Sequence, residues 1–301
     1  MFSIGWKFIN NTLLKTTIFT GLALIAFAAN SVLCRLALGN EAIDASSFTI
    51  LRLLSGSIVL LIIIGVSRKT TEVSTKGSWG ASFMLFLYAI TFSYAYISLD
   101  TGTGALILFG SVQITMIFLS LISGTRLHFT EWAGVTIAFT GFVYLILPGV
   151  TAPSIVGFLF MTVAGIAWGI YTLKGRASKN PLMDTAYNFF RTTPFVILLA
   201  IPTIYSANYS SEGIILALLS GGITSGIGYT IWYIALGGLS STQAAVLQLL
   251  VPVIATFGGV IFVSEAITFR LEISAAMVLG GILIVVLGRK FFSQHKFGLK
   301  K

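Results

Sequence analysis

Long apolar segments alternate with short polar stretches along nearly the whole chain. We place ten such segments, which begin near Thr17, Ser46, Trp79, Thr103, Phe129, Ser154, Thr185, Gly213, Thr242 and Thr268. A helix needs roughly 20 mostly apolar residues to cross the hydrocarbon core of a bilayer. Barrel strands would alternate apolar and polar positions over roughly 10 residues, whereas the stretch SGSIVLLIIIGV at 55–66 is apolar on every face. The pattern therefore predicts an all-α integral membrane protein with ten transmembrane helices.

Composition agrees with this pattern. Of the 301 residues, 56% are hydrophobic and 9% are charged, and the mean hydropathy is +0.97, which lies well outside the balance of soluble domains. The apolar run behind Lys7 and Lys15 has features of a secretory signal. Because it continues to about Leu38 without a clear cleavage site, we interpret it as a retained first helix. Cys34 is the only cysteine, which excludes an intrachain disulfide and a cysteine-based metal cluster.

The net charge of +9 is distributed unevenly among the predicted loops. With the N-terminus in the cytoplasm, 14 of the 18 Lys and Arg residues fall in alternate loops on that side. The positive-inside rule then predicts that both termini are cytoplasmic. Topology accounts for the basic balance, so we expect the lipid bilayer as a partner and no nucleic acid.

The two halves of the chain match each other weakly. At a shift of 139 positions, FTILR at 48–52 falls on YNFFR at 187–191, and at a shift of 137 YISL at 96–99 falls on YIAL at 233–236. The match defines two units of five helices, residues 1–149 and 150–301. An odd number of spans inverts the second unit relative to the first. The predicted fold is therefore a pair of inverted five-helix repeats.

Two equivalent loops carry exchanged charges, which fits this inversion. SGTRLHFTEWA at 123–133 has Arg126 where FVSEAITFRLE at 262–272 has Glu265. The first loop is predicted to be cytoplasmic and the second external, so the positive-inside bias favours a base in one and an acid in the other. Chance loop charge is the alternative, because Arg270 on the external side breaks the trend.

Several short motifs, in this order and spacing, resemble the EamA branch of the drug/metabolite transporter superfamily. They are LR at 51–52, WG at 168–169, FR at 190–191, Pro252 in the ninth helix and SEAIT at 264–268. The sequence departs from the family's pattern at Asn30, Gln113 and Arg126. The resemblance implies a secondary transporter of a bacterial inner membrane that exports amino acids or related metabolites and needs no cofactor. Nothing in the sequence requires an oligomer, and a monomer is compatible with it.

Two arginines are expected about six residues inside their helices, where an uncompensated charge is costly. Arg52, near the outer face, can pair with Glu265, Glu41 or Asp44, and Arg191, near the inner face, can pair with Glu131 or Asp184. Such pairs would act as gate latches, or the arginines would bind a carboxylate of the substrate. A structural role, in which each arginine bonds helix-end carbonyls or a loop carboxylate, is the alternative.

Polar and aromatic residues at mid-membrane depth are candidates for lining a small-molecule pathway. They are Asn30, Tyr88, Tyr96, Gln113, Trp168, Tyr171, Asn188, Tyr229, Trp232, Tyr233 and Gln248. Helix packing or an interfacial aromatic belt is the alternative for each. The clearest group is Tyr229, Trp232 and Tyr233, which share one helix face, while the Gly222 and Gly226 pair predicts close helix packing. Pro252 predicts either a hinge or a static kink.

The acidic residues are all predicted in loops or at helix ends, whereas a proton-coupled carrier usually keeps a carboxylate in the membrane interior. Glu265 is the best of these candidates for carrying a proton. A membrane-embedded enzyme is the alternative from another class. Only His128 and His295 are present, and no HExxH or GxSxG motif occurs, so we expect neither an enzyme nor a metal site. A channel or structural role remains as a further alternative.

Overall fold

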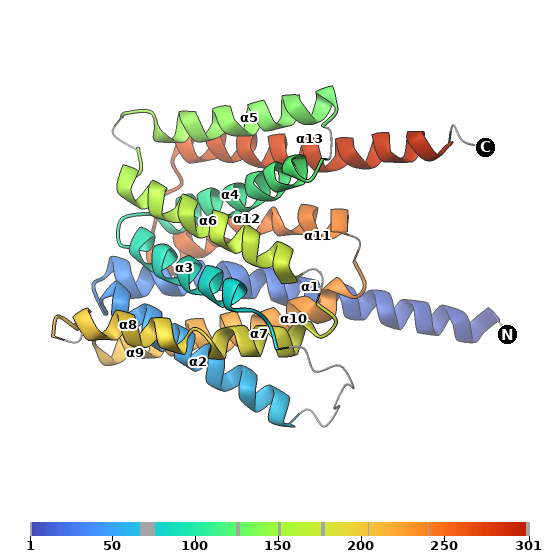
Figure 1. The fold of residues 1–301 in the computed structure, drawn as a ribbon. Helices are drawn as coiled ribbons and strands as arrows, with labels where there is room; N and C mark the ends of the chain where they lie inside the picture. Colours follow the sequence, from blue (N-terminus) through green and yellow to red (C-terminus); the bar gives the residue numbers. More distant parts are fainter. Residues whose placement is uncertain are drawn as a thin grey trace.

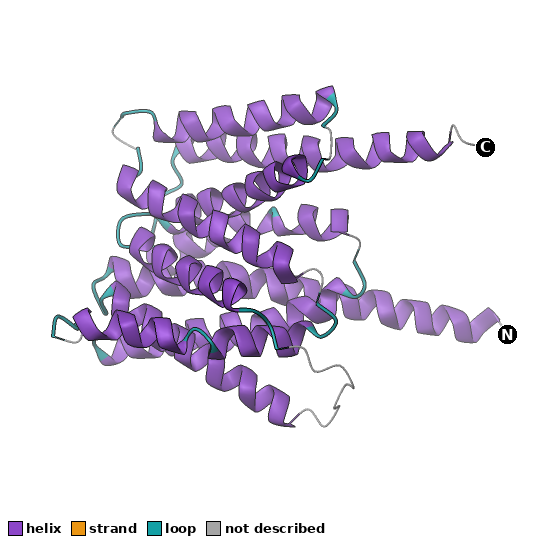
Figure 2. Ribbon diagram, in the orientation of Figure 1, coloured by secondary structure: helices purple, strands orange, loops and turns teal. Residues whose placement is uncertain are grey.

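The computed structural model describes residues 2–66, 76–124, 127–149, 152–175, 178–203, 205–239 and 241–298, with side chains described from Leu14 to Gly288 except at 241–242. These residues form helices joined by short loops, as Figure 2 shows. The β pairing among them is one isolated antiparallel bridge between Ile43 and Tyr209. The prediction of an all-α membrane protein is confirmed.

Seven helices run without interruption. They are α1 (Phe2–Gly39), α2 (Ala45–Val66), α3 (Trp79–Tyr96), α4 (Thr101–Ile122), α5 (Phe129–Ile146), α6 (Ile155–Gly175) and α13 (Phe269–Gly298). Local capping fixes some of these ends: the Ser78 side chain accepts from the backbone N–H of Ala81 at the start of α3, as expected for a serine N-cap.

The remaining helical segments are interrupted. They are α7 (Pro181–Phe190) with α8 (Thr193–Thr203), α9 (Ser211–Leu218) with the π-helix η1 (Leu219–Ile227) and α10 (Gly228–Leu236), and α11 (Ser241–Gln248) with α12 (Leu250–Gly258) and the π-helix η2 (Gly259–Val263). The break before α8 has a local cause, because Pro194 has no N–H for the carbonyl of Phe190. The Thr193 hydroxyl donates to that carbonyl across 2.6 Å instead.

Eight of the described helical segments are long and apolar enough to cross a membrane. Of the ten predicted spans, α3 and the α7–α8 pair fall outside this set. Tyrosine and serine residues lower the apolar content of α3, and α7 and α8 are each short because of the break between them. Exposed apolar side chains such as Ile58, Ile62 and Leu159 face outward from the bundle, as expected for a surface that contacts lipid tails.

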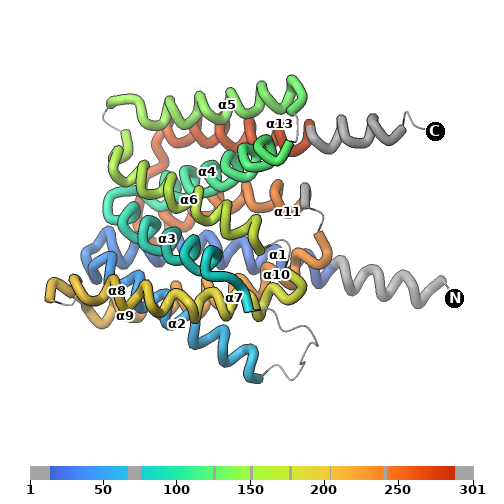
Figure 3. The backbone as a smooth tube through the Cα atoms, viewed as in Figure 1, coloured from blue at the N-terminus to red at the C-terminus, as the bar shows by residue number. Residues whose placement is uncertain are grey.

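The helices form one bundle whose long axes run in broadly the same direction (Figure 1). α1 runs from, and α13 runs towards, the same end of the bundle, which we call the terminal end; the other is the far end. Figure 3 shows α5 alongside α13. Their backbones meet at two glycines: a Cβ added to Gly134 would lie 2.5 Å from the carbonyl oxygen of Gly281, and one added to Gly281 would lie 2.5 Å from that of Gly134.

The interior of the bundle is built by helices from both halves of the chain. α6 packs against α3 and α4, α1 against α10 and α12, and α2 against η1 and α7. The most deeply buried side chains include Phe48, Phe92, Tyr96, Phe189 and Arg52. A buried arginine among aromatic rings makes this part of the core a candidate for ligand binding.

Candidate functional site

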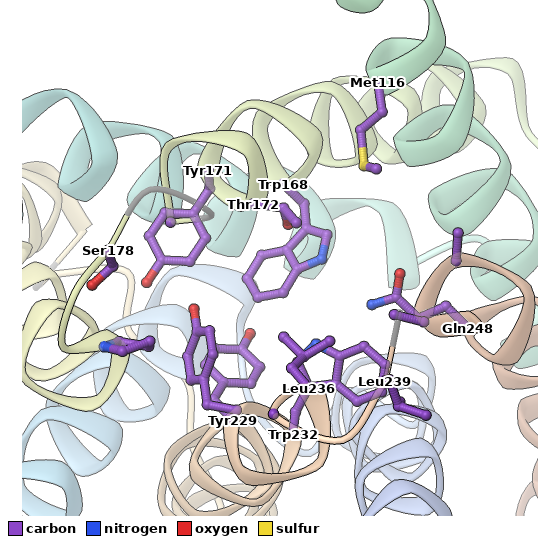
Figure 4. Close-up of a pocket in the computed structure, with 16 residues that line it drawn as sticks. Met116, Trp168, Tyr171, Thr172, Ser178, Tyr229, Trp232, Leu236, Leu239 and Gln248 are labelled. Atoms are coloured by element: carbon purple, nitrogen blue, oxygen red, sulfur yellow. The ribbon is translucent and has the colours of Figure 1, made fainter. Parts of the chain in front are cut away.

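A cavity of about 450 Å³ lies between α6, α10, α11 and the segment that joins α6 to α7. Its lining consists of Met116, Trp168, Tyr171, Thr172, Gly175, Ser178, Pro181, Tyr229, Trp232, Tyr233, Leu236, Gly237, Leu239, Ala244, Ala245 and Gln248. Figure 4 shows the rings of Trp168 and Tyr171 reaching in from α6 towards Tyr229 on α10. We call this space the main cavity. Its volume suits a small organic molecule.

The main cavity reaches the terminal end of the bundle. Its lining includes Gly175 at the end of α6, Pro181 at the start of α7 and Gly237 just after α10, and these helix ends lie at the terminal end in Figure 1. From there the lining extends inward to Trp168 and Tyr229.

Aromatic rings close the inner end of the main cavity. Trp168 stacks on Tyr171 with ring centroids 5.3 Å apart and meets Tyr229 at 5.0 Å. Phe27 of α1 packs edge-on against these rings, with its ring centroid 5.7 Å from that of Trp232 and 5.9 Å from that of Tyr229. The prediction that Tyr229, Trp232 and Tyr233 share one face is confirmed, since all three line the main cavity.

A second cavity of about 20 Å³, the inner cavity, lies behind this aromatic layer. Its lining consists of Phe27, Asn30, Ser31, Tyr88, Phe92, Leu108, Phe109, Trp168, Thr224 and Tyr229. Trp168 and Tyr229 therefore belong to both cavities. A volume of this size holds about one water molecule.

A buried polar network surrounds the inner cavity. Nη2 of Arg52 donates to the Tyr88 hydroxyl across 2.9 Å. Nδ2 of Asn30 lies 3.5 Å from the same hydroxyl, and Oδ1 of Asn30 accepts from the hydroxyls of Ser220 at 2.7 Å and Thr224 at 3.1 Å. The network joins α1, α2 and α3 to η1, so it connects the two halves of the chain.

Close packing of α2 on η1 positions Arg52. A Cβ added to Gly221 would lie 2.0 Å from Oγ of Ser55 and 2.1 Å from the carbonyl oxygen of Arg52. Only glycine fits at this contact. A Cβ added to Gly222 or Gly226 would lie 3.1 or 3.3 Å from a methyl carbon of Val59 on α2. The predicted close packing of this glycine pair is therefore confirmed, although Gly221 makes the tightest approach.

A charged cluster lies at the far end of the bundle. Nε of Arg35 donates to Oε1 of Glu265 across 3.1 Å, and Nη2 of Arg35 lies 3.6 Å from Oδ1 of Asp100. The Glu265 carboxylate also accepts from the backbone N–H of Thr101 at 2.8 Å. Nη1 of Arg35 donates to the carbonyls of Tyr96 and Ile97. This cluster, which we call the far-end clamp, ties α1, the α3–α4 turn and the segment after η2 together.

The predicted pairing of the two membrane arginines differs from the structure. Glu265 pairs with Arg35 and not with Arg52, and Asp44 accepts from the backbone N–H groups of Ser47 and Asn208. The relative rotation of the helices decides these partners, and sequence spacing does not encode it.

Arg191 likewise has other partners than Glu131 or Asp184. It donates to the carbonyl of Lys76 and lies over the Trp79 ring, with its guanidinium carbon 5.6 Å from the centroid. Asp184 accepts from the N–H of Gly77 at 2.7 Å, and Glu131 accepts from the N–H of His128 at 2.7 Å. These contacts anchor loops and helix starts at the terminal end. Arg126, expected in the loop equivalent to that of Glu265, lies outside the described residues.

Three predicted pathway residues lie away from both cavities. Tyr96 donates to the carbonyl of Thr101 at 3.3 Å, and Oδ1 of Asn188 accepts from the N–H of Ser78 at 3.0 Å, beside the start of α3. Gln113 is buried in α4, and its amide nitrogen has no hydrogen-bond partner within the described part of the chain. The other eight line the main cavity, the inner cavity or both.

The ninth predicted span is interrupted next to Pro252. α11 ends at Gln248 and α12 begins at Leu250. Proline at this position removes the N–H that would bond the Gln248 carbonyl. The break lies at the cavity wall, because the Gln248 side chain lines the main cavity.

Sequence reasoning missed two sets of functional candidates. Arg35 is not among the predicted site residues, although a carboxylate such as Glu265 near the end of a membrane helix commonly pairs with a base at the same depth. Phe92, Ser220 and Thr224 gave no signal, because an apolar ring and small hydroxyls are ordinary inside membrane helices. Within the described part of the chain, no group of three His, Cys, Asp or Glu side chains is close enough to hold a metal ion.

Comparisons with known proteins place this architecture in a family. The model of the EamA-like transporter family matches residues 155–287. An uncharacterized protein of Pseudomonas aeruginosa is 44% identical over 275 residues, covering 91% of this chain and 96% of its own length. An uncharacterized transporter of Archaeoglobus fulgidus is 25% identical, covering 90% of this chain and 96% of that protein.

A more distant relative and a solved structure extend the comparison. A protein of Escherichia coli described as a probable amino-acid metabolite efflux pump is 23% identical, covering 77% of this chain and 83% of its own length. A crystal structure matches with a TM-score of 0.58 at 20% identity, covering 89% of this chain and 98% of that chain, and likeness at this identity shows the fold alone. The family named by the sequence resemblance is confirmed: the chain belongs to the EamA-like transporter family of the drug/metabolite transporter superfamily.

Proposed function

We propose that this protein is a secondary transporter of the inner membrane that exports a small organic metabolite, an amino acid or a related compound. It works by alternating access between two inverted five-helix repeats, residues 1–149 and 150–301, which together cross the membrane ten times. Both termini are cytoplasmic in this proposal, so the main cavity faces the cytoplasm.

The single observation that carries the proposal is the asymmetry between the two ends of the bundle. The main cavity of about 450 Å³ reaches the terminal end, while the far-end clamp of Arg35, Asp100 and Glu265 joins helices at the other end. A main cavity that reaches one end, with helices tied to one another at the other end, fits one of the two end states of alternating access. A separate cavity of about 360 Å³ at the far end, lined by residues such as Leu38, Asp44 and Asn208, shares no lining residue with the main cavity.

Helix packing supports the inverted repeat. Under the sequence match, α1 corresponds to α6, α2 to α7–α8, α3 to α9–η1–α10, α4 to α11–α12–η2 and α5 to α13. The packing of α3 on α6 then corresponds to that of α10 on α1, the packing of α4 on α6 to that of α12 on α1, and the packing of α2 on η1 to that of α7 on α3. The α5–α13, α4–α12 and α2–α7 contacts each correspond to themselves. A pseudo-two-fold axis produces this set of paired contacts.

The lining of the main cavity supports a small amphipathic solute. Trp168, Tyr171, Trp232 and Tyr233 offer aromatic faces, and the Gln248 amide offers hydrogen bonds. Such a mixture binds an apolar part and orients a polar part. The name of the Escherichia coli relative, a probable amino-acid metabolite efflux pump, agrees with this class of solute.

Counterflow in proteoliposomes tests the proposal. The purified protein is reconstituted into vesicles loaded with a pool of L-amino acids and related metabolites, and uptake of each labelled solute is measured against protein-free vesicles. We expect saturable uptake of at least one solute. Chemical conversion of a solute without movement would contradict the proposal in favour of an enzyme, and an absence of uptake for every solute in the pool would contradict the proposed substrate class.

A further inference from the structure

Arg52 is a charged side chain enclosed in the middle of the bundle. It is 2% exposed and is among the largest fully buried side chains of the described residues. Its guanidinium carbon lies 4.8 Å from the ring centroid of Phe92 and 5.1 Å from that of Tyr88. Stacking on two rings and one hydrogen bond to Tyr88 hold the plane of the guanidinium in place.

Among the described residues, no carboxylate pairs with the charge of Arg52. Arg35, by contrast, pairs with Asp100 and Glu265. A buried charge without a counterion is strongly unfavourable and is retained at membrane depth where it serves a ligand or a pathway. The tyrosine hydroxyl of Tyr88 is a neutral acceptor and leaves the charge uncompensated.

One arm of the guanidinium is also without a hydrogen bond. Nη1 of Arg52 is buried and has no acceptor among the described residues, whereas Nη2 is bonded to Tyr88. Arginine presents its donors as a planar fork, which matches the two oxygens of a carboxylate. The free arm of Arg52 therefore suits a planar anion.

The inner cavity lies against the two rings that hold this group, although Arg52 itself is not part of its lining. Tyr88 and Phe92, the two side chains on which Arg52 stacks, both line the inner cavity. Trp168 and Tyr229 form the boundary between this space and the main cavity. A solute in the main cavity is separated from the Arg52 environment by that aromatic layer and by Tyr88.

We propose that Arg52 is the carboxylate-binding residue of an occluded subsite, which a solute enters from the main cavity when Trp168 and Tyr229 separate. The inference rests on the proposed transport function and narrows its substrate class to carboxylates with an apolar part. The carboxylate takes the free Nη1 and shares Nη2 with the Tyr88 hydroxyl, while the apolar part remains against Trp168 and Tyr229. The charge that is uncompensated in the empty protein becomes paired when the solute is bound.

Matched acid and amide probes test the subsite by binding. The unfolding midpoint Tm of the purified protein in detergent is measured with L-phenylalanine, L-leucine and phenylacetate, and with the carboxamide of each. We expect at least one acid to raise Tm and its amide to have an effect at least about tenfold weaker in half-saturating concentration, because loss of a charge-assisted hydrogen bond costs at least that factor. Equal effects of acid and amide, or no effect of any acid, would overturn the proposal. This measurement needs only the wild-type protein.

Variants assign the preference to Arg52. In Arg52→Gln the difference between acid and amide should disappear, and in Arg52→Lys, which keeps the charge and is the safer variant for folding, the acid should bind about tenfold more weakly than in the wild type. Arg191→Gln is the matched control, because Arg191 contacts Lys76 and Trp79 away from both cavities. Survival of the acid preference in Arg52→Gln would contradict the assignment.

The same measurements separate this inference from the transport proposal. Acid-selective stabilisation without counterflow would support the subsite and contradict the transporter. Counterflow of a solute that has no acidic group, at a rate unaffected by Arg52→Lys, would support the transporter and overturn the subsite.

Discussion

Nε of Arg35 and Oε1 of Glu265 lie 3.1 Å apart, although the two residues are 230 positions apart in the chain. Arg35 belongs to the last turns of α1, and Glu265 follows η2 in the second half. Their side chains are 19% and 12% exposed, so the pair is only partly screened by solvent. The pair links the two halves at the far end, where they must separate if the bundle is to open there.

Glu265→Gln should loosen the far-end clamp. The variant loses the charge that faces Arg35 and weakens the hydrogen bond from Thr101, so we expect a loss of about 1 to 3 kcal/mol in the free energy of unfolding. Opening is measured by the reaction of a membrane-impermeant thiol reagent with Ser31→Cys, added from the far-end side in a Cys34→Ser background. Ser31 is 1% exposed and lines the inner cavity, and its labelling should become several-fold faster.

Glu272→Gln is the control for this experiment, because Glu272 is exposed near the start of α13. It should leave both the unfolding free energy and the labelling rate unchanged. Equal labelling rates in Glu265→Gln and in the parent protein would show that the clamp does not hold the far end closed.

Ala245→Trp should fill the main cavity. Ala245 lines the cavity on α11, and an indole there occupies the space that a solute needs. We expect counterflow to fall at least about tenfold with little change in Tm, since the cavity accepts added volume without overpacking the core. Val253→Trp is the matched control, because Val253 is 40% exposed on α12 and lies outside the cavity lining. Similar losses in both variants would contradict a role for the main cavity.

Gly221→Ala should separate α2 from η1. Its Cβ would lie 2.0 Å from Oγ of Ser55 and 2.1 Å from the Arg52 carbonyl oxygen, one of which is rigid backbone. We expect a destabilisation of about 1 to 3 kcal/mol, measured as a lower midpoint in chemical or thermal unfolding. Gly280→Ala on α13 has no atom within 4 Å of the added Cβ and should be neutral or slightly stabilising. A neutral Gly221→Ala would mean that the α2–η1 contact is looser than described.

The inverted repeat predicts the sidedness of two loops. Ser123 lies in the loop after α4, and Ile267 lies in the loop after η2. These two loops occupy equivalent positions in the two halves of the chain. In a Cys34→Ser background, Ser123→Cys should react with an impermeant reagent in inside-out vesicles and Ile267→Cys in intact cells. Labelling of both positions from the same side would refute the two-repeat arrangement and the proposed orientation.

Much of the fold was predictable, because a helix that crosses a membrane needs a long run of apolar residues and such runs are visible in the sequence. α2 to α6 and α13 begin within two residues of the predicted starts, whereas α1 begins at Phe2 and not near Thr17. Tyr229, Trp232 and Tyr233 share a face because helical spacing alone decides it. The break near Pro252 was likewise readable from the chemistry of proline.

The side-chain partners were less predictable because they depend on helix rotation and depth. Arg52 was expected beside a carboxylate, yet it faces Tyr88 and Phe92, while Arg35 takes Glu265. Asn188 was expected in the pathway, yet it accepts from the N–H of Ser78 at the start of α3. A one-residue change in helix phase turns a side chain by about 100°, and sequence spacing within one helix does not fix the phase between two.

The boundary between the two cavities has a kinetic consequence. It includes the side chains of Trp168 and Tyr229, so opening this boundary requires torsional changes of these two rings. Ring reorientation of this kind is fast, whereas collective movement of helices takes microseconds to milliseconds. In the proposed transport cycle, opening and closing of this boundary should therefore repeat many times before each turnover, and the rate-limiting barrier should lie in the movement of the two halves.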